Sequence, residues 1–130
     1  MSTGDLVIVD QFIDRTHGRV GTFFGEGVVA HIAFSDPICP RQAARLFASA
    51  QAAAQAAGKG ATVHQGGTYI VINGPQFSTR AESWMYRNWG ADVIGMTGFS
   101  EARLAREAEL CYASAAMVTV TSLPITSKAT

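Results

Sequence analysis

The chain has 130 residues, of which 48% are hydrophobic and 15% are charged, and its formal net charge is zero. This composition predicts one folded domain with a real core and excludes an intrinsically disordered chain. Lys and Arg are scattered, which gives no reason to expect nucleic-acid binding, and no apolar run approaches the ~20 residues that a membrane-spanning helix needs. The short polar start does not resemble a signal peptide, so we expect a cytoplasmic protein with no membrane partner.

In the first half of the chain, two apolar runs predict strands at residues 6–9 and 27–33. The polar stretch between them, residues 13–26, predicts a long irregular loop, a kind of segment that often carries function. Residues 41–57 are rich in Ala and Gln and predict a helix, which Gly58 is expected to end.

The middle of the chain predicts a β-hairpin. Residues 61–65 and 68–73 have the composition of two strands. Gly66 and Gly67 join them, and paired glycines between apolar runs are typical of a tight turn that pairs its two strands.

The second half of the chain alternates helices and strands. Thr79 and Glu82 have the spacing of a capping box, so a helix is expected to follow and to run to about Trp89. The remaining elements are a short strand at 92–96, an amphipathic helix at 100–109 and a long apolar strand at 110–120. Helices alternating with nearly uniformly apolar strands predict an α/β layered domain with a mostly parallel or mixed central sheet.

The cysteines and histidines give no sign of a metal centre. Cys39 and Cys111 lie far apart and each stands alone, so we expect two free thiols in a reducing compartment. His17, His31 and His64 show no ligand grouping. We expect His17 to be a solvated loop residue, His31 a hydrogen-bonded structural histidine and His64 a residue on the face of a strand.

Candidate binding groups occur in three places. One is the polar loop at residues 14–17 together with His31, unless its histidines are simply solvated or structural. The other two are turns that follow strands, where such groups gather in α/β folds. The turn at residues 74–82 presents the ring of Phe77 and the hydroxyl of Ser78, on which a flat heterocycle could stack and hydrogen-bond. The alternative is a core side chain and part of a helix cap. The turn at residues 95–98 presents Thr97 and backbone N–H groups to an anion, unless it is an ordinary strand-to-helix turn.

Longer motifs in the same regions resemble those of the 5′-methylthioadenosine phosphorylases, a branch of the trimeric purine nucleoside phosphorylases. The motifs are VDQFIDRT at 9–16, NGPQFSTRAES at 73–83, WGADVIGMT at 89–97 and EARLAREA at 101–108, and the likeness covers about residues 6–119. The resemblance implies part of a three-layer αβα fold with a mixed central sheet. It also implies a homotrimer that cleaves a purine nucleoside with phosphate as co-substrate, and with no metal or other cofactor.

The same resemblance implies roles for five residues. Phe77 packs against the purine, and Ser78 lies at the base, where relatives that prefer guanine and hypoxanthine carry Glu. Met96 meets the ribose, Thr97 binds phosphate, and His31 is contributed by a neighbouring subunit near the 5′ substituent. Ser78 therefore favours 5′-methylthioadenosine as the substrate, with adenine and 5-methylthioribose 1-phosphate as products.

The family pattern is incomplete in this sequence. The Gly-rich opening strand and the Arg-His phosphate site of the family are absent, and Val120 stands where the family carries an Asp that hydrogen-bonds the purine. Residues 120–130 show no family likeness. We therefore expect residues 1–130 to be a truncated, partial phosphorylase domain that is inactive, or nearly so, on its own. The alternatives are a non-catalytic nucleoside-binding or assembly module and a gene fragment.

Overall fold

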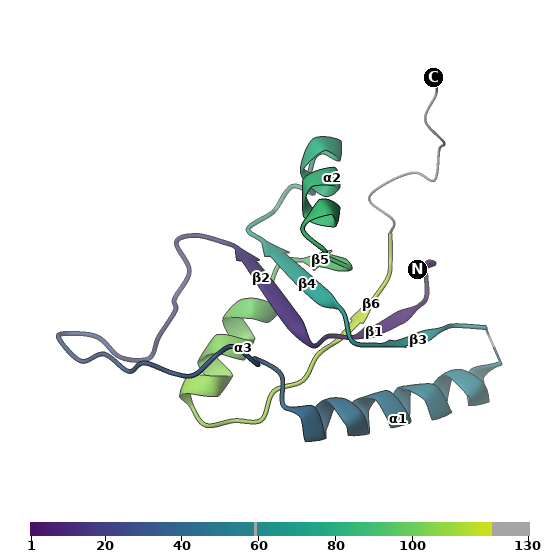
Figure 1. The fold of residues 1–130 in the computed structure, drawn as a ribbon, viewed down its shortest axis with the longest axis horizontal. Helices are drawn as coiled ribbons and strands as arrows, with labels where there is room; N and C mark the ends of the chain where they lie inside the picture. Colours follow the sequence, from purple (N-terminus) through teal and green to yellow (C-terminus); the bar gives the residue numbers. More distant parts are fainter. Residues whose placement is uncertain (59, 121–130) are drawn as a thin grey trace.

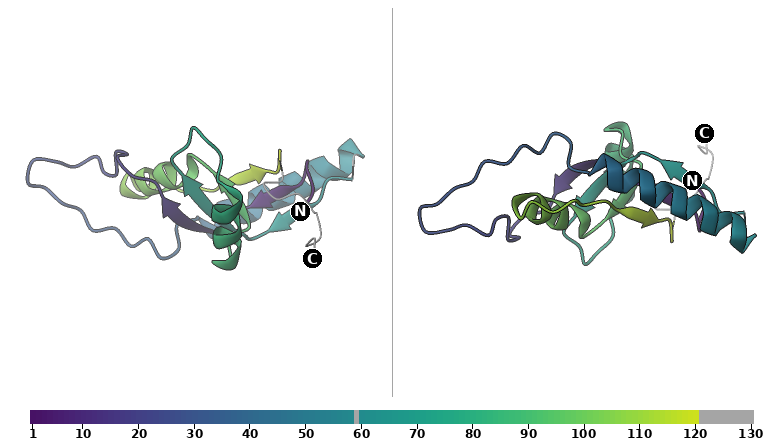
Figure 2. Two further views of the ribbon diagram at one scale, coloured as in Figure 1. Left: turned by 90° about the horizontal axis from the view of Figure 1, so that it is seen from above. Right: turned by 90° about the horizontal axis from the view of Figure 1, so that it is seen from below.

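The structure is a computed structural model that describes residues 1–58 and 60–120. Its elements are β1 (Leu6–Ile8), β2 (Gln11–Arg15), α1 (Pro40–Ala57), β3 (Val63–Gln65), β4 (Thr68–Ile72), α2 (Arg80–Asn88), β5 (Val93–Gly95), α3 (Gly98–Glu107) and β6 (Ala115–Met117). In Figures 1 and 2, α2 lies on one side of the strands, whereas α1 and α3 lie on the other. Helices on both sides of the strands confirm the expected layered α/β architecture.

Two sheets of three strands, in the orders β3-β1-β6 and β2-β4-β5, are built on one pair of long bent strands. Leu6 faces Val63 and, beyond the bend, Gln11 faces Thr68, so that in both pairs the partner lies 57 positions further along the chain. β1 and β2 are therefore consecutive parts of one strand, and β3 and β4 are parts of its parallel neighbour. β6 joins β1 antiparallel and β5 joins β4 in parallel, which gives the expected mixed pairing.

The predicted hairpin is wrong, because β3 and β4 do not pair with each other. Gly66 and Gly67 instead form the bend, and the pairing runs through it: Gly66 N donates to Ile8 O (3.0 Å), and Asp10 N donates to Gly67 O (3.2 Å). Gly66 has a φ of +83°, and a Cβ on Gly67 would lie 2.8 Å from Val7 Cγ1. Glycine is needed at position 67 because the neighbouring strand comes so close. In the sequence, a pair of glycines at such a bend looks the same as a pair of glycines in a tight turn.

Five side chains of β1, the residue after it and β4 form the centre of the core. They are Val7, Ile8, Val9, Ile70 and Val71, each at most 2% exposed. The predicted buried strand at residues 6–9 is confirmed. α1 packs against β1 and β3, while α3 packs against β2 and β4.

The helices begin and end close to the positions that local signals predict. α1 ends at Gly58, whose φ of +61° suits glycine. α2 begins behind the predicted capping box: Glu82 N donates to Thr79 Oγ1 (3.2 Å), and Thr79 N donates to Glu82 Oε2 (2.7 Å). α3 begins at Gly98, slightly earlier than predicted.

Residues 27–33 do not form the predicted strand. They belong to one long loop, residues 16–39, which extends away from the sheets (Figure 2). Val28 and Val29 are 59% and 73% exposed, so their apolar character does not reflect burial in a sheet. Conversely, β2 takes up the first residues of the predicted 13–26 loop, and β6 is much shorter than the predicted last strand.

The expectation of two free thiols is wrong. Cys39 and Cys111 form a disulfide, with their Cα atoms 5.3 Å apart. Cys39 N also donates to Tyr112 O (2.8 Å), so the residue before α1 lies beside the segment that follows α3. The two cysteines are 72 positions apart, and their approach depends on how the whole chain packs, which spacing along the sequence does not reveal.

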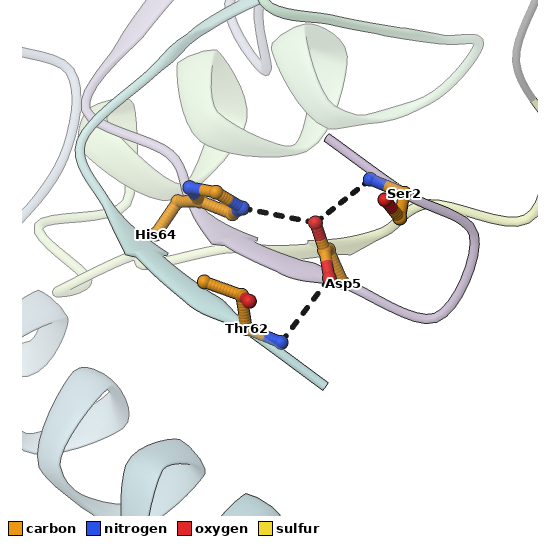
Figure 3. Close-up of polar contacts among 4 residues, drawn as sticks. All are labelled: Ser2, Asp5, Thr62 and His64. Carbon is orange, nitrogen blue, oxygen red and sulfur yellow. Dashed lines mark hydrogen bonds and ion pairs between the residues drawn. The ribbon is translucent and has the colours of Figure 1, made fainter. Parts of the chain in front are cut away.

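Asp5 ties the start of β1 to the neighbouring strand (Figure 3). The buried carboxylate accepts from Ser2 N (2.8 Å) and Thr62 N (3.1 Å), and it lies 3.1 Å from His64 Nε2. These hydrogen bonds, led by the one from Ser2, lower the pKa of Asp5 to about 2. His64 is thus a strand residue, as expected, and its ring also hydrogen-bonds Asp5.

Three further predictions concern membrane spans, a metal site and the C-terminal tail. Within residues 1–58 and 60–120, no helix combines the length and apolar character needed to cross a membrane. The same residues bring together no group of three His, Cys, Asp or Glu side chains that could hold a metal ion. The predicted unrelated tail lies outside the described residues, apart from Val120, which is 65% exposed.

Candidate functional site

The two turns that the sequence singles out lie at one edge of a sheet. β4 and β5 are parallel neighbours, with Val71 opposite Gly95, so their carboxyl ends meet at the same edge. The chain leaves β4 through residues 73–78, called the 73–78 turn below, and it leaves β5 through Met96 and Thr97. Groups on the two turns can therefore act on one ligand.

Met96 packs directly against the 73–78 turn. Gly74 has a φ of +68°, and a Cβ at this position would overlap Met96 Sδ. A residue larger than glycine would therefore have to displace the half-buried Met96 side chain. The two turns form one packed unit rather than two independent loops.

Phe77 and Ser78 do not have the structural roles that were the alternative to ligand binding. Phe77 is 76% exposed, so it is not a core side chain. Ser78 is not the helix cap, because Thr79 caps α2. Ser78 Oγ instead lies 2.8 Å from the Oγ of Ser83, a buried residue of α2. The ring is open to a ligand, and the hydroxyl beside it is held in place.

A cavity of about 230 Å³ opens beside these two residues. Besides Phe77 and Ser78, its lining includes Arg15, His17, Asn73, Glu82 and Tyr86. The Thr79 N–H, which donates to the Glu82 carboxylate, lowers the pKa of Glu82. An exposed ring beside a few fixed polar groups suits a flat heterocycle.

Thr97 does not line this cavity and lies on the neighbouring turn. It is exposed at the N-cap position of α3, and its side chain makes no capping hydrogen bond. The first N–H groups of α3 have no acceptor within the helix, and this end carries the positive part of the helix dipole. The position suits an anion such as phosphate. The structure thus groups Phe77 with Ser78, and it sets Met96 and Thr97 alongside them.

His31 is not brought to these groups within the described chain. It is exposed in the long loop and does not line the cavity. Val120 follows β6, which belongs to the other sheet, and it does not line the cavity either.

The cavity takes in Arg15 and His17 from the polar loop at residues 14–17, and it adds Asn73, to which the sequence assigns no role in binding. His17 N donates to Asn73 Oδ1 (3.1 Å), and Asn73 Nδ2 donates to His17 O (3.2 Å), so the Asn73 side chain extends the pairing of β2 and β4 beyond its end. The Arg15 guanidinium lies 5.6 Å from the ring centre of Trp89. Residues 14–17 are a candidate place in the sequence, but assigning them to a loop misses that the end of β2 brings Arg15 and His17 to the sheet edge.

Comparison with known proteins shows the family. The model of the phosphorylase superfamily matches residues 1–125. The chain therefore belongs to the phosphorylase superfamily. Among curated relatives, the S-methyl-5′-thioadenosine phosphorylase of Cereibacter sphaeroides is 57% identical over 119 residues, which are 92% of this chain and 39% of the relative. That of Geobacter sulfurreducens is 60% identical over 117 residues, or 89% and 39% of the two chains.

Solved structures have the same fold. A methylthioadenosine phosphorylase sourced from an Antarctic soil metagenomic library is 52% identical with a TM-score of 0.81, and the match covers 89% of this chain and 39% of that chain. A methylthioadenosine phosphorylase from Schistosoma mansoni in complex with tubercidin is 38% identical with a TM-score of 0.82, over 90% and 47% of the two chains. The chain thus spans about two fifths of the length of the curated relatives that it matches.

Proposed function

We propose that this chain provides part of the active site of an enzyme that cleaves purine nucleosides with phosphate, and that its preferred substrate is 5′-methylthioadenosine. The observation that carries this proposal is the exposed ring of Phe77 and the fixed hydroxyl of Ser78, beside Met96 and Thr97 at one sheet edge. The names of the relatives support the choice of nucleoside.

In the proposed reaction, phosphate attacks C1′ of the sugar and the glycosidic bond breaks. The bonding electron pair leaves with the purine, which takes up the proton that the attacking hydrogen phosphate gives up, and the products are adenine and 5-methylthioribose 1-phosphate. Phe77 stacks on the base, Ser78 hydrogen-bonds its edge, and Met96 contacts the ribose. Thr97 and the N-terminus of α3 hold phosphate beneath the sugar, where its charge stabilises a transition state with oxocarbenium character.

We further propose that the enzyme is a trimer in which His31, exposed on the long loop, reaches the 5′ substituent in the site of a neighbouring subunit. Phosphate is a co-substrate, and the reaction needs no other cofactor. We propose that the reaction serves purine and methionine salvage in the cytoplasm.

A second candidate function is nucleoside binding without catalysis, and Val120 favours it. The family that the sequence resembles carries an Asp at this position, whereas the valine side chain can neither donate nor accept a hydrogen bond. A group that assists the leaving base contributes typically about 10²–10⁴ in rate. The 130-residue chain is therefore expected to bind the nucleoside but to turn it over slowly.

Calorimetric titration with adenine and with 5′-methylthioadenosine, together with an assay of phosphate-dependent adenine release, tests these functions. We expect both ligands to bind. Phe77→Ala should weaken adenine binding about tenfold, because stacking on an aromatic ring contributes about 1–3 kcal/mol per base. The loss is attributable to the ligand, since the ring contributes little to the core. Phe23→Ala, which removes another exposed ring, is the matched control and should bind adenine normally.

Ser78→Glu probes the edge of the base in the same titrations. A carboxylate only accepts hydrogen bonds, and it would face the acceptor N1 of adenine, so adenine binding should fall while binding of hypoxanthine, which carries a proton on N1, should be retained. Wild-type chain that binds neither ligand would overturn both candidate functions. Adenine release as fast as that of a full-length relative would exclude the non-catalytic one.

A further inference from the structure

Arg19 joins the ends of two strands through backbone carbonyls. It lies in the long loop just beyond β2, and its half-buried side chain points back to the sheet edge. Nη1 donates to Met96 O, while Nη2 lies 3.2 Å from Asn73 O and 3.4 Å from Ile72 O. One guanidinium therefore contacts the end of β4, the 73–78 turn and the exit from β5.

These carbonyls belong to residues where the strand pairing stops, so they need another donor or water. The planar guanidinium offers five N–H donors in a fixed fork and can serve two chain segments at once. A lysine has a single ammonium group and cannot span the same acceptors. The acceptors of Arg19 are therefore backbone carbonyl dipoles rather than a carboxylate. The ion pair found among the described residues lies elsewhere, between Asp5 and His64.

We propose that Arg19 is a positioning residue, which sets the separation between the 73–78 turn and the turn that carries Met96 and Thr97. This inference rests on the proposed function, in which the first turn holds the base and the second holds the ribose and phosphate. The packing of Met96 against Gly74 is an independent sign that the separation is closely defined. A whole nucleoside must contact both turns at once, whereas free adenine needs only the first.

The proposal predicts a selective loss of affinity. In Arg19→Ala, water replaces the guanidinium at the three carbonyls and the two turns are no longer tied, so the affinity for 5′-methylthioadenosine should fall about tenfold or more, by analogy with other lost charged hydrogen bonds. The affinity for adenine should change less than about threefold. Arg19→Lys keeps the charge but not the fork, and it should resemble the alanine variant.

Chemical rescue separates positioning from a general loss of structure. Guanidinium chloride, added to Arg19→Ala far below denaturing concentrations, should restore nucleoside affinity, whereas sodium chloride at the same ionic strength should not. Arg106→Ala is the matched control, because Arg106 also donates to two loop carbonyls, those of Ala33 (2.8 Å) and Asp36 (2.6 Å), away from the strand ends. Because Arg106 holds the loop that carries His31, this control is expected to leave the affinity for adenine and the amide exchange at residues 73–74 and 96–98 unchanged.

Amide hydrogen exchange in the ligand-free chain provides a readout that does not depend on the proposed function. Exchange should increase in Arg19→Ala at residues 73–74 and 96–98, and not at the distant core strand β1. Equal weakening of adenine and nucleoside, failure of guanidinium to rescue, or unchanged exchange at these residues would each overturn the proposal. If the wild-type chain binds no nucleoside, the proposed function fails. Amide hydrogen exchange in the ligand-free chain then tests separately whether Arg19 holds the two strand ends together.

Discussion

Asp5 makes the stability of one end of a sheet depend on pH. Its carboxylate accepts from the N–H groups of Ser2 and Thr62 and faces His64 (Figure 3), and its pKa is lowered from 3.8 to about 2. A carboxyl with a lowered pKa stabilises the folded chain above its unfolded pKa. That contribution is lost as pH falls through the folded value, so the sensitive window runs from about pH 4 to about pH 2.

We expect Asp5→Asn to lower the midpoint of thermal unfolding at pH 7 and to flatten the loss of stability between about pH 4 and pH 2. The amide nitrogen of Asn donates, so it cannot replace the carboxylate toward all of its donors. Thermal scans by circular dichroism at a series of pH values measure both effects. Ser2→Ala is the control, because the donor of Ser2 is its backbone N–H. An acid profile identical to that of wild type would contradict this role of Asp5.

Individual residues are predictable where their partners lie close in sequence. Thr79 and Glu82 form the capping box that their spacing predicts, because donor and acceptor sit within one helical turn. The disulfide of Cys39 joins positions 72 apart, and its partner could not be recognised from spacing. The roles of Phe77 and Ser78 in binding stay predictions, although the exposure of the ring and the fixed hydroxyl agree with them.

At the scale of elements, α2 supplies one wall of the candidate site, with Glu82 and Tyr86 lining the cavity. Its capping box fixes where the helix begins. We expect Thr79→Ala to lower the free energy of unfolding by about 1 kcal/mol, because the helix loses a side-chain acceptor for one of its first N–H groups. Urea denaturation followed by circular dichroism measures the change. Thr79→Ser keeps the hydroxyl and should be close to wild type; equal losses in the two variants would argue against capping.

Helices were easier to predict than strands, and the reason is physical. The residues that end α1 and begin α2, Gly58 and Thr79, are adjacent to these helices in the sequence. Strands take their identity from partners elsewhere in the chain. The apolar residues 27–33 have no partner strand within residues 1–58 and 60–120, and they form part of a loop. In contrast, β2 is polar enough to look like a loop but pairs with β4 along its whole length.

At the scale of the whole molecule, alternation of helices and apolar strands was sufficient to predict an α/β fold. It was not sufficient to predict that two bent strands build both sheets. That feature depends on the close contact of Gly67 with Val7, which is invisible without the neighbouring strand. The candidate site follows from the same topology, because the parallel order β2-β4-β5 brings three strand ends to one edge.

Breaking the disulfide tests how far the sheet region under α1 and the sheet region under α3 depend on each other for stability. It links the start of α1, which packs on β1 and β3, to the segment after α3, which packs on β2 and β4. Because the bond closes a long loop, reducing it should lower the free energy of unfolding by about 2–4 kcal/mol through the entropy of the unfolded chain. Urea denaturation with and without dithiothreitol measures this loss, with the double variant Cys39→Ser and Cys111→Ser as the reductant-insensitive control. Equal stability of oxidised and reduced chains would mean that the two regions are held together by packing alone.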